Sequence, residues 1–174
     1  MSKASSRTLS TPPTDRKTRA VRPAGGAIQW QEETFLPNLS ASSIEEALAA
    51  IVGALAQVGA VIHAPGVVAA LVEREHVAPT AVGEGVAIPH CRSILVRRPA
   101  IAFARLASPL DFGAADGEPV RALWVLVAPE SMRAEEYLKL LAGIAGMVKE
   151  AAVRKAIAAA RTFAEFHKIV VNRI

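Results

Sequence analysis

A histidine at the end of a glycine-rich stretch is the residue in this sequence best placed to do chemistry. His90 closes the segment VGEGVAIPH, and Arg92 follows two residues later. Gly83 and Gly85 let the backbone take a positive φ or approach another group closely, and Pro89 restricts the chain just before the histidine. Residues i and i+2 of an extended chain share a face. We therefore expect an imidazole and a guanidinium on the same side of this segment.

An imidazole beside a guanidinium is suited to carrying a phosphoryl group. The pKa of an unperturbed histidine is about 6.5, so a neutral, nucleophilic ring is available at physiological pH. A guanidinium and backbone N–H groups hold phosphoryl oxygens through hydrogen bonds. Thr80 and Ser93, which flank the segment, could add hydroxyl donors. From the residues alone, two hypotheses stay open: a phosphoryl-accepting histidine, or an ordinary turn at a strand end.

Other kinds of site are poorly supported. Cys91 is the neighbour of His90, and neighbours in an extended chain point to opposite faces, so the two do not form a catalytic dyad. The sequence has no cysteine or histidine cluster at metal-ligand spacing and no G-x-G-x-x-G dinucleotide fingerprint. Solvated or structurally bonded roles are expected for the other histidines, which are His63, His76 and His167.

The composition is typical of one folded domain. The chain has 174 residues, of which 52% are hydrophobic, enough to bury a single core. No stretch approaches the ~20 apolar residues of a membrane helix, and the N-terminus lacks the apolar run of a signal peptide. The lone cysteine excludes an internal disulfide and suits a reducing compartment. We therefore expect a cytoplasmic protein with no membrane insertion.

The positive charge of the chain is concentrated at its N-terminus. The formal net charge is +4, but residues 1–30 hold six basic residues against the single acid Asp15. This tail carries +5, which leaves −1 for the other 144 residues. Rich in Ser, Thr, Pro and Gly, residues 1–30 are expected to be a disordered basic tail. A nucleic-acid partner is unlikely on this pattern, because the folded part is nearly neutral.

Patterns of apolar residues predict the elements that must position His90. Overlapping S-x-x-E capping boxes precede a helical stripe that starts at Ile44, and a near-continuous apolar run at Arg121–Val127 indicates an inner strand. Helices that surround several strands predict an α/β sandwich with a mixed central sheet. The other predicted elements are a helix over Val67–Arg74, a strand over Pro99–Leu106, a loop over Ser108–Val120, and helices over Arg133–Lys149 (Leu138, Leu141, Ala145 and Val148 inward), Ala151–Ala160 and Phe163–Val171. Thr162 and Glu165 are predicted to form the capping box of the last helix.

Several motifs together resemble a known family. The segment EREHVAPTAVGEGVAIPH, which ends at His90, is similar to the active-site segment of fructose/mannitol-type enzyme IIA domains of the bacterial phosphotransferase system. The nitrogen-regulatory branch is the nearest in pattern. The similarity continues through LDFGAADGEPV, LWVLVAP and YLKLLA in the right order. It implies the family's α/β sandwich, with the domain over residues 35–172.

The resemblance also implies a function and its residues. His90 would be phosphorylated as a tele-phosphohistidine by a histidine phosphocarrier protein. The phosphoryl group would pass to an enzyme IIB domain, or the phosphorylation state would signal to a regulatory target. With no transporter segment attached, we expect regulation rather than dedicated sugar uptake. The resemblance implies no metal or organic cofactor. The candidates for stabilising the phosphoryl group are Arg74, Thr80, Arg92 and Tyr137, although a helix-end role for Arg74 and a packing role for Tyr137 stay open.

Two positions depart from the family pattern. Tyr137 stands where the family has a second histidine, and a neutral phenol donates one hydrogen bond without the charge of an imidazolium. Cys91 stands where the family usually has glycine, and a positive φ there would cost about 1 kcal/mol. Tyr137 motivates the alternative that the domain is a non-catalytic binding module that has lost efficient transfer. A nucleic-acid-binding role for the tail is the weakest hypothesis.

Overall fold

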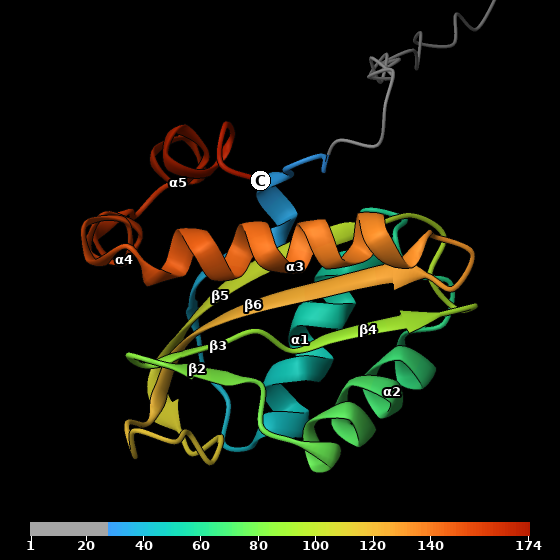
Figure 1. Ribbon diagram of the computed structural model, residues 1–174, viewed down its shortest axis with the longest axis horizontal. Helices are drawn as coiled ribbons and strands as arrows, with labels where there is room; N and C mark the ends of the chain where they lie inside the picture. Colours follow the sequence, from blue (N-terminus) through green and yellow to red (C-terminus); the bar gives the residue numbers. More distant parts are fainter. Residues whose placement is uncertain (1–27) are drawn as a thin grey trace, which may run out of the picture.

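A mixed six-stranded sheet with helices on both faces frames the protein (Figure 1). The computed structural model describes residues 28–174; residues 1–27, most of the predicted disordered tail, lie outside the described residues. The strands are β1 (Phe35–Leu39), β2 (Ala81–Gly83), β3 (Val86–Ala87), β4 (His90–Ser93), β5 (Ala100–Leu110) and β6 (Val120–Pro129). Their order is β1-β5-β6-β3-β2, and β4 also pairs with β6. Parallel and antiparallel pairs both occur, which confirms the predicted α/β sandwich with a mixed sheet.

Two helical layers cover the sheet, each with its own apolar cluster. The helices are α1 (Ile44–Gln57), α2 (Ala64–Val77), α3 (Ala134–Lys149), α4 (Ala151–Ala159) and α5 (Phe163–Val170). The first two pack on one face, and the last three on the other. Alternate residues of β5 serve the two layers, since Ala102 and Ala104 face α1 and α2 while Ile101 and Phe103 face the other cluster. No helix among residues 28–174 is long and apolar enough to cross a membrane.

Packing begins a few residues before Phe35, the residue at which the resemblance implied that the domain starts. Trp30 makes edge-to-face contacts with Trp124 and Phe166, at centroid distances of 6.3 and 5.7 Å. A short 3-10 helix at Glu32–Thr34 then leads into β1. Edge-to-face aromatic pairs stabilise beyond their buried area. Trp30 is therefore part of the folded core, although the Ser- and Pro-rich composition of residues 1–30 predicted that it belongs to the tail.

The segment before His90 is a hairpin, whereas its sequence was interpreted as one extended segment. Gly83, Glu84 and Gly85 all have positive φ, at 87°, 57° and 70°. Two consecutive positive φ values at Glu84 and Gly85 suit a two-residue hairpin turn, whose twist matches the strands. The carboxylate of Asp116 accepts a 2.8 Å hydrogen bond from the backbone N–H of Glu84. The apolar run is thus split into β2 and β3, and His90 opens a separate strand.

Other boundaries also differ from the sequence patterns. β5 continues to Leu110, so the loop predicted from residue 108 starts later. α2 is longer than Val67–Arg74.

Three of the four residues predicted to face inward from α3 do so, because Val148 is buried and Leu141 and Ala145 pack against the second apolar cluster. The prediction for Leu138 is wrong, since Leu138 is 60% exposed and its neighbour Tyr137 is buried. A stripe that includes 137, 141, 144 and 148 also fits the helical period, and contact with the sheet determines which stripe is buried.

Three helices begin at side-chain caps. Ser43 accepts from the N–H of Glu46, and Thr162 forms a complete capping box with Glu165, as the sequence predicted. α2 is capped by His63, whose Nδ1 accepts a 3.1 Å hydrogen bond from the N–H of Gly66. The predicted structural role of His63 is therefore an N-cap, which an imidazole can fill only with Nδ1 unprotonated.

Replacing His63 tests this cap. We expect His63→Ala to lower the free energy of unfolding by about 1 kcal/mol, because the Gly66 N–H loses its acceptor. His63→Asp supplies a preferred capping side chain and a negative charge at the helix N-terminus, so it should match or exceed the wild type. Urea denaturation at pH 7 measures both. Equal stability of the alanine and aspartate variants would contradict the cap.

Candidate active site

His90 is positioned by β4, which lies beside the central strand of the sheet. β4 runs parallel to β6, with His90 opposite Leu126, and the backbone N–H of Leu126 donates to the carbonyl of Pro89 at 3.0 Å. α2 packs against β4 from the side of the first apolar cluster. Pro89 is buried and the imidazole of His90 is half-buried. The ring is therefore held at the surface by backbone that is fixed on both sides.

The imidazole of His90 is locked in one tautomer. Its Nδ1 lies 2.7 Å from the carbonyl oxygen of Ile88. A carbonyl oxygen can only accept, so Nδ1 must donate and carry the proton. The lone pair of the neutral ring is then on Nε2, which is the free nucleophilic nitrogen.

Burial lowers the pKa of His90 below its ordinary value. The hydrogen bond to Ile88 opposes this effect, the charge of Arg74 adds to it, and the charge of Glu75 opposes it. Desolvation disfavours the charged form of an imidazole. The ring is therefore neutral and nucleophilic at pH 7.

The lowered pKa of His90 predicts a pH dependence of stability. Because the unfolded state binds this proton more readily, stability rises with pH between the folded and unfolded pKa values. The contribution of His90 is thus complete above about pH 6.5 and is lost as the pH falls below that value. An NMR titration of the His90 ring should give a midpoint below 6.5. His90→Gln should abolish this part of the pH dependence, and a midpoint above 6.5 would contradict the prediction.

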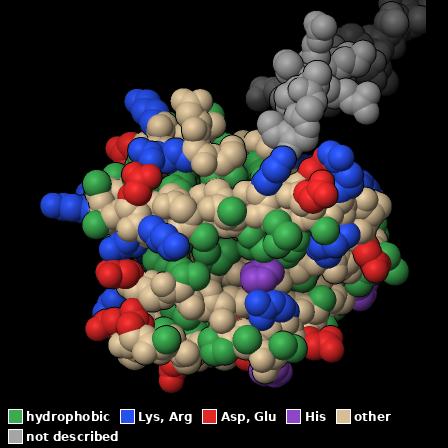
Figure 2. All heavy atoms as spheres, viewed as in Figure 1, with side chains coloured by type: hydrophobic (Ala, Val, Ile, Leu, Met, Phe, Trp, Pro, Cys, Tyr) green, Lys and Arg blue, Asp and Glu red, His purple; other side chains and the backbone are tan. Residues whose placement is uncertain are grey.

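An open hollow of about 510 Å³ lies beside His90 and gathers three of the four predicted stabilising residues. Arg74, Arg92 and Tyr137 line it together with His90. Figure 2 shows this side of the molecule, where basic and apolar side chains border a histidine near the centre of the face. The structure thus brings a nucleophilic ring, two guanidinium groups and a phenol to one surface depression.

Both arginines are anchored by backbone carbonyls. Arg92 donates through Nη2 to the carbonyls of Glu130 and Met132, and its Cζ lies 5.9 Å from the ring centroid of Tyr137. Arg74 donates through Nη1 to the carbonyl of Ala78 at 2.9 Å, so its helix-end role is real. A guanidinium has five N–H donors. These anchors therefore fix the two groups and leave donors for an anion.

Thr80 belongs to a hydrogen-bonded chain behind the histidine, and it does not line the hollow. Its N–H and hydroxyl both donate to the buried carboxylate of Glu75, at 2.7 and 2.5 Å. Its carbonyl accepts from the N–H of Ile88 at 3.0 Å, and the carbonyl of Ile88 accepts from His90. Four residues thus link α2 to the reactive ring, and Thr80 is placed to position it rather than to contact a phosphoryl group.

Sequence reasoning missed Glu75. A signal was available, because Glu75 continues the buried stripe of Val67 and Leu71 at intervals of four residues. A carboxylate on the apolar face of a helix needs buried hydrogen-bond donors. Glu75 finds them in Thr80, five residues further along the chain.

Tyr137 has a buried hydroxyl that lacks a hydrogen-bond partner within residues 28–174. Its ring centroid lies 6.3 Å from that of His90. Burial raises the pKa of Tyr137 above its ordinary value, and the neighbouring Cys91 adds to the shift. The phenol therefore stays protonated, and its O–H has an unused hydrogen bond to donate.

Cys91 is a core residue and carries no strain. It is buried in the first apolar cluster, pairs with Val127 in the β4–β6 ladder, and burial raises the pKa of its thiol to about 11. Within the described chain, the non-glycine residue with positive φ is Glu84. The strain considered at Cys91 does not arise, because extended backbone continues through this position. In residues 28–174 no group of three His, Cys, Asp or Glu side chains could hold a metal ion.

Solved structures of known proteins share this fold. The solved structure of nitrogen regulatory protein IIA-Ntr from Neisseria meningitidis superimposes with a TM-score of 0.75 and 26% identity, covering 80% of this chain and 94% of that one. The mannitol IIA protein of Escherichia coli shares the fold, with a TM-score of 0.69 and 20% identity over 82% and 99% of the two chains. The class of protein is therefore a phosphotransferase-system IIA domain of the mannitol and nitrogen-regulatory fold.

Sequence matches agree with this class. A "Nitrogen regulatory protein" of Pseudomonas aeruginosa is 44% identical over 59% of this chain and 66% of its own length. One of Bradyrhizobium diazoefficiens is 36% identical over 74% and 83%. The family model "Phosphoenolpyruvate-dependent sugar phosphotransferase system, EIIA 2" matches residues 29–173. The chain belongs to this family, as its motifs predicted, and domains of the family act in phosphoryl transfer.

Proposed function

We propose that the protein accepts a phosphoryl group on Nε2 of His90 from a histidine phosphocarrier protein. The observation that carries the proposal is the bond from Nδ1 to the Ile88 carbonyl, which leaves Nε2 as the free nitrogen in the hollow. The lowered pKa of His90 keeps that nitrogen nucleophilic at neutral pH. A nucleophile at a defined position next to fixed cations is what phosphoryl transfer requires.

The transfer step exchanges one N–P bond for another. The lone pair of Nε2 forms a bond to phosphorus, while the N–P bond of the donor's phosphohistidine breaks and its electron pair returns to the donor ring. Nδ1 of His90 keeps its proton, so the phosphorylated ring gains positive charge. The Ile88 carbonyl and the buried carboxylate of Glu75 favour that charge. Arg74 and Arg92 face the phosphoryl oxygens, and the hydroxyl of Tyr137 donates its free hydrogen bond.

The surface around the hollow suits docking of a protein donor and a protein recipient. Val77 lines the hollow and Leu138 follows Tyr137 on α3, and both are large exposed apolar residues. Exposed apolar patches rimmed by polar groups mark protein interaction sites. The similarity to nitrogen regulatory proteins favours a regulatory target as recipient over an enzyme IIB domain. We assign this action to the domain over residues 35–172, in the cytoplasm.

Mass spectrometry of the intact protein tests this proposal. After incubation with phosphoenolpyruvate, enzyme I and the phosphocarrier protein, the wild type should gain one acid-labile, base-stable phosphate, and His90→Gln should gain none. Nitrogen-15 NMR should place the phosphate on Nε2. An unmodified wild type, beside a relative that is labelled under the same conditions, would overturn the proposal.

A second candidate rests on Tyr137. If a neutral phenol supports the phosphoryl group too weakly, the domain acts as a non-catalytic binding module. Partner binding and the downstream phenotype would then be unchanged in His90→Gln. Loss of both in that variant would exclude this candidate.

A further inference from the structure

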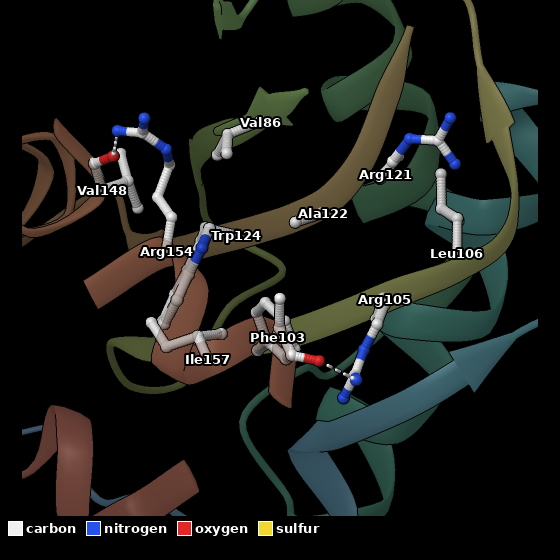
Figure 3. A pocket seen from close by; sticks show the side chains of 11 residues that line it. Val86, Phe103, Arg105, Leu106, Arg121, Ala122, Trp124, Val148, Arg154 and Ile157 are labelled. Atoms are coloured by element: carbon white, nitrogen blue, oxygen red, sulfur yellow. Dashed lines mark hydrogen bonds between the residues drawn. The ribbon is translucent and has the colours of Figure 1, made fainter. Parts of the chain in front are cut away.

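Arg154 joins three elements at the C-terminal end of α3. From the first turn of α4, its Nη1 donates to the carbonyls of Val148 and Lys149, at 3.0 and 2.8 Å (Figure 3). Its Nη2 pairs with the carboxylate of Glu84 at 3.0 Å. The last carbonyls of a helix have no partner within the helix, and a cation is favourable there. One guanidinium therefore caps α3 and ties it to the tip of the β2–β3 hairpin.

The tip of this hairpin is fixed to the sheet. The backbone N–H of Glu84 donates to Asp116 at 2.8 Å, and the carbonyl of Gly85 accepts from the N–H of Ala122 on β6 at 3.1 Å. Glu84 has a φ of 57°, which Gly or Asn adopts more readily than Glu. The ion pair with Arg154 gives this turn a use for a longer acidic side chain. Arg154 thus attaches α3 to the strands that lead to His90.

Apolar packing alone does not set the position of this end of α3. A cavity of about 230 Å³ lies between the sheet and the corner where α3 meets α4, and Arg154 is part of its lining (Figure 3). The apolar part of the lining includes Val86, Phe103, Ala122, Trp124, Val148 and Ile157. Protein interiors leave few voids larger than a water molecule, and atoms that line a void lose contacts on one side. The polar bonds of Arg154 therefore hold a corner that side-chain contacts leave loose.

α3 carries the position of this corner to the reactive site. Tyr137 lies in the first turn of α3 and Val148 in the last, so the two are roughly 16 Å apart along the helix axis. Just before the helix, Arg92 donates to two backbone carbonyls. The ring centroid of Tyr137 is 6.3 Å from that of His90. The helix is thus held by one arginine at each end, and its seat on the sheet determines how Tyr137 meets His90.

We propose that Arg154 is a positioning residue for phosphoryl transfer. It holds α3 where the Tyr137 hydroxyl can donate to a phosphoryl group on His90. Arg154 acts through the helix, since it does not line the hollow at His90. This role rests on the proposed function, because it belongs to the same reaction.

A double-mutant cycle on the full chain tests this role. Arg154→Met keeps an apolar side chain at the cavity but loses the guanidinium, and it should lower the equilibrium level of phosphohistidine severalfold. Tyr137→Phe should lower that level severalfold in the wild type and have almost no further effect in Arg154→Met, because the effects of coupled residues do not add. Intact mass after incubation with phosphoenolpyruvate, enzyme I and the phosphocarrier protein gives the level in each variant.

Two further variants separate positioning from stability. Glu84→Asn suits a positive φ but is one methylene shorter and uncharged, so it should reduce the effect of Tyr137→Phe as Arg154→Met does. Arg105→Met is the matched control. Arg105 donates to two carbonyls at the end of α4 across the same cavity, and within residues 28–174 it has no hydrogen bond to α3 or to Glu84. Its loss should destabilise the protein and leave the full effect of Tyr137→Phe.

Several outcomes would contradict the role of Arg154. They are a full effect of Tyr137→Phe in Arg154→Met, loss of that effect in Arg105→Met as well, and a Tyr137→Phe protein with the wild-type level. If Arg154→Met does not fold, Glu84→Asn decides by the same comparison.

A wild type that gains no phosphate would overturn the proposed function instead. The position of α3 is then measured in the unphosphorylated protein, by NMR cross-relaxation between the ring protons of His90 and Tyr137. This signal should weaken in Arg154→Met and in Glu84→Asn but not in Arg105→Met. An unchanged signal in all three variants would show that Arg154 does not position the helix.

Discussion

Glutamine in place of Glu75 is expected to slow phosphorylation of His90 at least tenfold and to lower the free energy of unfolding by about 1–3 kcal/mol. Two buried donors of Thr80 meet the Glu75 carboxylate, and an amide offers one acceptor and an N–H in its place. The Thr80 hydroxyl must then accept from the amide N–H, and its own buried proton loses its acceptor. We expect Thr80 to shift as a result. Its carbonyl holds Ile88, and the carbonyl of Ile88 holds Nδ1 of His90, so the imidazole loses its fixed orientation.

A purely structural role of Glu75 would predict a different result. The charge of Glu75 raises the pKa of His90, so the NMR titration midpoint of His90 should fall further in Glu75→Gln. Thr80→Ser keeps both donors, so it should keep the wild-type titration midpoint of His90 and the wild-type rate of phosphorylation. Thr80→Val loses the hydroxyl donor and should change both. Reduced stability with an unchanged His90 midpoint and an unchanged transfer rate would limit Glu75 to folding.

Exchanging Tyr137 for histidine and for phenylalanine should move phosphorylation in opposite directions. Tyr137→His offers an imidazolium donor, and hydrogen bonds between charged partners are about twice as strong as neutral ones. We expect the equilibrium level of phosphohistidine to rise about tenfold. Tyr137→Phe removes the hydroxyl and should lower that level severalfold. The phosphorylated fraction against donor concentration, measured by intact mass, gives both values.

Stability separates a site role of Tyr137 from a packing role. The Tyr137 hydroxyl is buried without a partner in the unphosphorylated protein, so Tyr137→Phe should be as stable as the wild type or more stable. Tyr137→Leu loses the ring and should be destabilised by about 1–3 kcal/mol. If phenylalanine leaves the phosphohistidine level unchanged, Tyr137 serves packing alone.

The sequence was most informative where one local pattern determines the structure. The unbroken apolar run near Trp124 predicted an inner strand, because a strand covered on both faces must be apolar throughout. Thr162 and Glu165 predicted a helix start, because a capping box is closed by residues three positions apart. His90 was recognised because glycines and a proline surround it.

Features that depend on distant contacts escaped prediction. The hairpin at Glu84 needs Asp116, which lies 32 residues away. The face of α3 that turns inward depends on the sheet, which buries Tyr137 and exposes Leu138. Propensity and spacing describe neighbours along a chain, and these features join parts that meet only after folding.

The unequal residue sizes on the two faces of β5 bear on how this protein can diverge. The face toward α1 and α2 presents Ala102 and Ala104, while the other face presents Ile101 and Phe103. Added volume at an alanine in a filled core costs about 1–3 kcal/mol, whereas large apolar residues can exchange among themselves at less cost. The layer of α1 and α2 is thus constrained against change, and the aromatic layer of α3, α4 and α5 is the side on which descendants of this sequence can change the shape of their side chains more freely.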